Sequence, residues 1–125
     1  MNAHSMAAAA YGTPNTALKT ARSAEYDVIA RITARLRKAH AGGVMSFPAL
    51  AEALTENRRL WIEFTVDLSA PENPLPMALK GQLLSLANFT LNHTAAILEG
   101  RESAEVLIDI NTAVMRGLAG KADVS

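Results

Sequence analysis

Apolar residues recur along most of this chain with the period of an α-helix. Between residues 13 and 41 they follow one stripe at spacings of three and four, and Gly42-Gly43 ends it. Thr13-Pro14 is a good helix opening, a capping hydroxyl followed by proline in the first turn. The stripe, which includes one carboxylate, is Leu18, Ala21, Glu25, Ile29, Ile32, Leu36 and Ala39. This pattern predicts a first helix whose arginines and lysines lie largely on the solvent side.

A heptad-like seam predicts the second helix. Ser46 and Pro48 supply its start, and the segment 69–74, with two prolines, supplies its end. The seam positions, spaced by four and three residues, are Leu50, Leu54, Asn57, Trp61, Phe64 and Leu68. Such spacing is typical of antiparallel helix packing.

A third helix is predicted from about Pro74 to Glu99, and it is apolar on two faces. One face carries Leu79, Leu83, Leu86, Thr90, His93 and Ile97. The second carries Leu84, Ala87, Leu91, Thr94 and Leu98. A helix of this kind is normally surrounded by other helices or covered by a partner.

Ser103 is the predicted cap of a fourth helix, which Gly117 and Gly120 are expected to end. The chain shows no internal repeat, no strand-like alternation and only short connections. We therefore predict an all-α protein, an antiparallel four-helix bundle. Residues 13–120 would form the single helical domain, and residues 1–12 a flexible N-terminal tail.

Composition narrows the functional classes. The chain has 125 residues, of which 50% are apolar, and it contains no cysteine. His4, His40 and His93 are scattered, and neither a phosphate loop nor a nucleophile elbow is present. We expect no catalytic, metal or cofactor site, and hence no enzyme. The absence of a long apolar run and of a basic leader favours a cytoplasmic protein without a membrane span.

Charge is balanced overall but unevenly distributed. Residues 1–62 hold eight Lys/Arg against four Asp/Glu, and residues 63–125 hold the reverse. Nucleic-acid binding by the basic half is disfavoured, because the charged side of its first helix lacks the interleaved aromatics that stack on single-stranded bases. A solvated basic face is the simpler interpretation.

Two asparagines occupy seam positions where apolar residues are expected. Asn57 lies between Leu54 and Trp61, and Asn111 lies between Leu107 and Val114. A buried amide without a hydrogen bond costs roughly 1–3 kcal/mol, so each needs a partner. Seam asparagines commonly fix helix register. A sharper hypothesis is one structural polar layer formed by Glu25, Asn57 and Asn111, with Arg58 as a further candidate.

At these residues the chain resembles the FlaF family of flagellar biosynthesis regulators. The resemblance covers about residues 10–118, and the order and spacing of its short motifs carry it. They are Ala10-Tyr11, Glu25, Thr33 to Leu36, Asn57-Arg58-Arg59-Leu60-Trp61, Asp67-Leu68, Asn73-x-Leu75-Pro76, Leu79, Leu86-Ala87-x-Phe89, Leu107-Ile108-Asp109-Ile110-Asn111 and Met115-Arg116-Gly117-Leu118.

The resemblance implies a cytoplasmic protein of bacterial flagellum biogenesis, a secretion chaperone that binds flagellin and promotes its synthesis and export. It also implies a functional link to the regulator FlbT. An amphipathic terminal segment of flagellin would suit helix-in-groove recognition. We expect Leu84, Ala87, Leu91 and Leu98 to form the groove floor, with Trp61 and Phe64 as a possible wall, although aromatics in a bundle usually belong to the core. Tyr11 in the tail would act as a lid over the empty groove.

Two alternatives remain open from sequence. One is a post-transcriptional regulator that acts on flagellin mRNA, directly or with FlbT. The other is an adaptor to the export machinery through the acidic surface of the fourth helix, at Glu102, Glu105 and Asp109.

Overall fold

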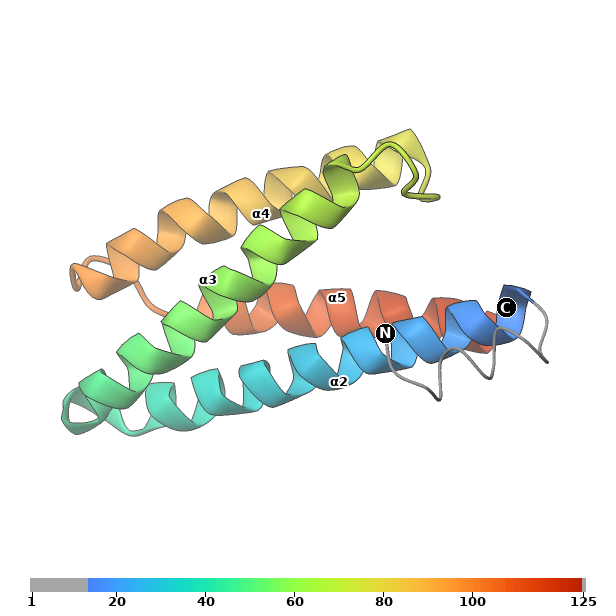
Figure 1. Ribbon diagram of the computed structural model, residues 1–125. Helices are drawn as coiled ribbons and strands as arrows, with labels where there is room; N and C mark the ends of the chain where they lie inside the picture. The colour runs from blue at the N-terminus through green and yellow to red at the C-terminus, as the bar shows by residue number, and fades with distance from the viewer. Residues whose placement is uncertain (1–13, 125) are drawn as a thin grey trace.

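A computed structural model describes the backbone of residues 14–124, and it is helical throughout its regular structure (Figure 1). The elements are α2 (Pro14–Ala41), the 3-10 turn η1 (Gly43–Ser46), α3 (Phe47–Ser69), α4 (Met77–Leu98) and α5 (Glu105–Val124). The all-α prediction is therefore confirmed. The expected tail, with Tyr11, lies outside the described residues. Within the described part of the chain, no helix has the length and apolarity needed to cross a membrane.

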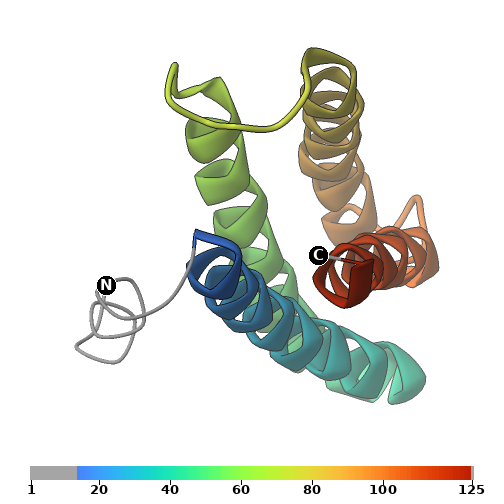
Figure 2. The ribbon, with the colours of Figure 1, turned by 90° about the vertical axis from the view of Figure 1, so that its right-hand side faces the viewer.

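Successive helices run in opposite directions, but they do not close tightly around one axis (Figure 1). α2 packs along both α5 and α3, and α3 packs along α4. In Figure 1, α3 rises steeply from the turn that follows α2, at the lower left, to the α3–α4 turn at the upper right. In Figure 2, the upper parts of α3 and α4 lie above the α2–α5 pair. The α3–α4 hairpin therefore lies across α2 and α5 and leaves one side of α4 without a neighbouring helix.

The core consists of two apolar clusters. One gathers near the η1 turn and the α4–α5 connection and comprises Leu36, Ala53, Leu54, Ile97, Ala104, Leu107 and Ile108. The other lies farther along α2, α3 and α5 and comprises Ile29, Ile32, Leu60 and Met115, with Phe64 and Val114 packed against it. Each cluster draws on the apolar stripes that the sequence predicted for these helices.

The helix starts show which predicted caps operate. The Ser103 hydroxyl accepts a hydrogen bond from the Glu105 amide at 3.1 Å, as expected for a cap at the start of α5. Ser46 precedes α3 but makes no capping bond. Its hydroxyl oxygen instead lies 1.9 Å from the position that a Cβ on Gly42 would occupy. Gly43 has a left-handed backbone, with a φ of +67°. The two glycines are thus needed for different reasons, space at 42 and backbone conformation at 43.

Two predicted boundaries differ from the structure. α4 begins at Met77 rather than at about Pro74, because Pro76 has an extended backbone (φ −58°, ψ 146°) and flanks the helix as its N-cap. Before it, the Asn73 side chain accepts a bond from the Leu75 amide and holds the turn. α5 continues through Gly117 and Gly120 to Val124. Gly117 does not adopt a positive φ, so it does not end the helix.

Candidate functional site

Asn111 is the centre of a buried polar layer. Its side-chain carbonyl accepts a hydrogen bond from the Trp61 indole N–H at 3.0 Å. Its amide nitrogen donates to Asn57 Oδ1 at 2.8 Å and to Thr33 Oγ1 at 3.2 Å. The Thr33 hydroxyl in turn donates to the Ile29 carbonyl at 2.6 Å. One residue on α5 thus connects α2 and α3 through side-chain hydrogen bonds.

The layer is fully enclosed and separates the two apolar clusters. Thr33, Asn57, Trp61 and Asn111 are each no more than 1% exposed. Along α3, Asn57 stands between Leu54 of one cluster and Leu60 of the other. A slip of one helical turn would place these amides against apolar side chains, at the cost of unpaired buried polar groups. The layer therefore fixes the register of α2, α3 and α5.

Glu25 does not take part in this layer. Its side chain is exposed, and it precedes Thr33 by eight residues, about 12 Å along a helix. Arg58 is also exposed. The hydrophobic stripe correctly indicated the face of α2 on which Glu25 lies, but it could not indicate where along that face α3 and α5 cross. Thr33 supplies the α2 contact instead, and its place among Ile29, Ile32 and Leu36 was the available signal.

The residues expected to form a partner-binding groove fall into two groups. Trp61 and Ala87 are each 1% exposed and belong to the interior. Phe64 is half-buried and meets Trp61 edge to face, with ring centroids 5.4 Å apart. Leu84 and Leu91 are half-buried, and Leu98 is 42% exposed. The structure therefore leaves the leucines accessible and removes Trp61 as a wall.

We group those leucines with two exposed apolar residues of α3, the helix that packs along α4, and call the group the outer α3–α4 face. It consists of Ile62, Val66, Leu84, Leu91 and Leu98. Ile62 and Val66 are 37% and 68% exposed and lie one turn apart, and α3 packs along α4. Neither lies on the predicted seam of α3, so the sequence analysis missed them. Their signal was an apolar i, i+4 pair on the side of the helix away from that seam.

The solvent side of α4 carries no charge. All its exposed residues are apolar, small or amide-bearing, and the one charged residue, Lys80, is half-buried. Surfaces that face water permanently are normally rich in Lys, Glu, Arg and Asp. Charged residues are depleted at the centres of protein interfaces. The uncharged side of α4 thus has the composition of a contact surface.

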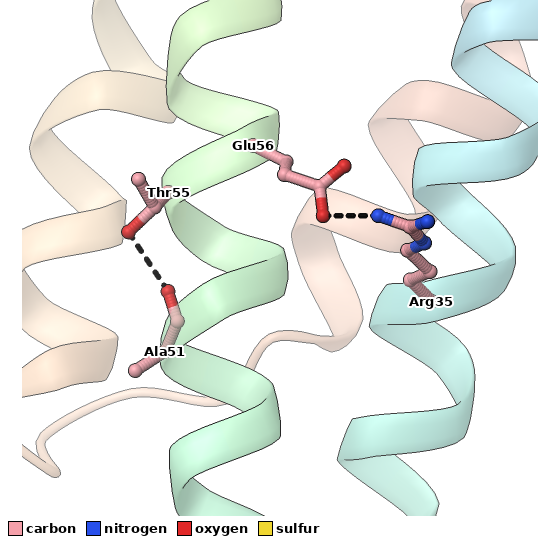
Figure 3. A network of polar contacts seen from close by, with 4 residues as sticks. All are labelled: Arg35, Ala51, Thr55 and Glu56. Atoms are coloured by element: carbon pink, nitrogen blue, oxygen red, sulfur yellow. Dashed lines mark hydrogen bonds and ion pairs between the residues drawn. The ribbon is translucent and has the colours of Figure 1, made fainter.

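The α2–α3 side has a different character. Arg35 of α2 forms an ion pair with Glu56 of α3 (Figure 3). Within α3, the Thr55 hydroxyl donates a hydrogen bond to the Ala51 carbonyl at 2.9 Å. A pocket of about 430 Å³ lies beside this pair, lined by residues of both charge signs including Lys38 and Glu52. Arg37 donates to the Thr112 hydroxyl at 3.0 Å and ties α2 to α5. The Arg35–Glu56 and Arg37–Thr112 contacts thus join α2 to its two neighbouring helices.

His93 holds the end of α4 against the next connection. Its Nε2 lies 3.2 Å from the Ser103 carbonyl, and its ring stacks on Phe89 with centroids 5.0 Å apart. Within the described residues, no three His, Cys, Asp or Glu side chains are grouped as metal ligands would be. His93 is therefore a structural contact of the α4–α5 turn.

The fold and these surfaces define a small helical protein with a buried polar layer and with accessible apolar side chains beside an α4 side that carries no exposed charge. The chain matches the family described as flagellar protein FlaF over residues 7–118, and it belongs to that family. The protein is thus a flagellum-related protein. No curated protein and no solved structure matched the chain.

Proposed function

We propose that this protein is a flagellin-binding export chaperone that acts in the cytoplasm, before flagellin is secreted. The carrying observation is the outer α3–α4 face, whose apolar side chains are exposed or half-buried and whose α4 side carries no exposed charge. FlaF membership supplies the flagellar context. Binding flagellin before export would keep its polymerising segments covered.

The shape of the face suits an amphipathic helix. Leu84, Leu91 and Leu98 recur every seven residues along α4, and Ile62 and Val66 lie one turn apart on the neighbouring helix. A ligand helix laid between α3 and α4 would place its anchors at i, i+3 or i+4, and i+7 against them. The terminal segments of flagellin are the proposed ligands because they are amphipathic.

The alternative of direct flagellin mRNA binding rests on the basic side of α2. Arg31 and Lys38 are exposed there, but Arg35 and Arg37 are engaged by Glu56 and Thr112. The outer α3–α4 face gives the stronger support to a protein ligand.

Co-purification tests the proposal. The full chain would be expressed with complete flagellin and with flagellin lacking its first or its last terminal segment. We expect one truncation to abolish co-purification and the other to preserve it. Retention of binding with both truncations would contradict recognition of a terminal segment. Retention of flagellin mRNA in the purified complex, sensitive to ribonuclease and to salt, would favour the alternative.

A further inference from the structure

The solvent side of α4 carries a heptad repeat. Met77, Leu84, Leu91 and Leu98 stand seven residues apart along the whole helix, and Gly81, Asn88 and Ala95 lie between them at spacings of four and three. We call these heptad positions of α4 the ladder. Its end residues Met77 and Leu98 are 82% and 42% exposed, so both ends of the ladder are accessible to solvent. A sustained repeat of this kind is the pattern of a helix that packs against another helix.

No helix of the described chain fills that role. α4 packs extensively along α3 only. The buried residues of α4, which include Ala87, Thr90 and Thr94, lie outside the heptad positions. Asn88, at the middle of the ladder, is exposed. A single polar asparagine at such a position characteristically pairs with its equivalent in a partner helix and fixes the register.

We infer that a second copy of this chain covers the outer α3–α4 face when no flagellin is bound. A two-fold axis close to Asn88 would set the two α4 helices antiparallel. It would bring Leu84 of one copy near Leu91 of the other and Met77 near Leu98. Two antiparallel copies of the ladder would thus set leucine or methionine against leucine, which is the self-complementarity that an isologous interface requires. The exposed side of α4 has no charge to repel its copy.

The dimensions of the face favour this occupant over one isolated helix. α4 has 22 residues, which gives a length of about 33 Å at 1.5 Å per residue. Two helices packed 8–10 Å apart make a face about 20 Å wide. Each copy would then cover roughly 650 Å², and the pair about 1,300 Å², within the range of specific interfaces. A single ligand helix would cover about half of that face.

The dimer itself is argued from α4 alone and does not depend on the proposed function, whereas its displacement by flagellin rests on that function. The dimer would protect the apolar face in the free protein, and flagellin would displace the second copy. The apolar face would therefore stay covered, first by the second copy and then by flagellin.

Sedimentation of the full chain tests the inference. We expect the wild-type mass to rise with concentration towards twice the 13.3 kDa of one chain. Asn88→Arg would place two cations at the centre of the interface and raise the dimer dissociation constant at least ten-fold. Gln82→Arg places an arginine at another exposed amide of α4, outside the ladder, and should change the dimer dissociation constant less than two-fold. Circular dichroism of both variants would verify that they fold.

The outcomes separate the two proposals. A wild-type protein that stays monomeric at all concentrations overturns the second copy, even if flagellin binds. A dimer that Asn88→Arg leaves intact overturns the outer α3–α4 face as its interface. A dimer that Asn88→Arg disrupts, in a protein that never binds flagellin, supports the inference and refutes the proposed function.

Discussion

At the residue scale, the two seam asparagines have unequal roles. Asn111 has partners for both ends of its amide, namely Trp61, Asn57 and Thr33. Asn57 accepts one bond, and its own Nδ2 has no partner among the described residues. The sequence predicted both positions because each interrupts an apolar seam. It could not rank them, because the ranking depends on which side chains of other helices reach them.

Asn111→Leu should therefore destabilise the protein more than Asn57→Leu. The first leaves the Trp61 indole N–H and the Asn57 amide buried without partners, at about 2–4 kcal/mol. The second removes one bond together with an unpaired donor and should cost about 1 kcal/mol or less. Urea unfolding of both variants measures the difference. Equal costs, or the reverse order, would contradict the central place of Asn111.

Trp61 offers a second test because it is the one tryptophan of the chain and is 1% exposed. A ligand on the outer α3–α4 face does not reach it. Titration with a tryptophan-free flagellin segment should leave its emission maximum unchanged while the segment binds. A large shift of that maximum on binding would place the ligand against Trp61, as in the hypothesis of an aromatic groove wall.

At the element scale, helix positions were predictable and helix limits were less so. Apolar periodicity is local to each helix, so it indicated all four. Limits depend on backbone conformation at single residues. Gly100 has a φ of +78° and lies between α4 and α5, whereas Gly117 continues α5. Both are glycines after an apolar stripe, and the sequence alone does not distinguish them.

Alanine substitution distinguishes these two glycines. A Cβ would meet nothing within 4 Å at either position, so backbone conformation alone decides the result. Gly117→Ala should stabilise the protein by about 0.5–1 kcal/mol, because alanine is the better helix former. Gly100→Ala should destabilise it by about 1–2 kcal/mol, because its left-handed backbone is costly for alanine. Chemical unfolding of both variants checks the signs, and destabilisation by Gly117→Ala would indicate that α5 ends there.

At the scale of the whole molecule, the sequence predicted an antiparallel four-helix bundle but not its openness. The steep crossing of α3 in Figure 1 depends on how side chains of different helices pack against one another, and apolar periodicity within one helix carries no information on that angle. The result is a molecule with a basic α2 side and an uncharged α4 side. The two proposed ligands would use different sides.

Salt therefore discriminates between the ligands. Flagellin bound through the outer α3–α4 face should lose less than about three-fold in affinity between 50 and 200 mM salt, with a negative heat-capacity change. RNA held by several cations of α2 would lose at least about ten-fold over the same range. Calorimetry at both salt concentrations measures these changes, and steep weakening of flagellin binding would argue against an apolar contact.

The most direct test of the central claim measures flagellin binding by the wild type, Asn88→Arg and Gln82→Arg under identical conditions. We expect Asn88→Arg to weaken binding at least ten-fold and Gln82→Arg to change it less than two-fold, because only the first lies on the ladder of α4. Wild-type affinity in a correctly folded Asn88→Arg variant would contradict the claim that flagellin binds the outer α3–α4 face.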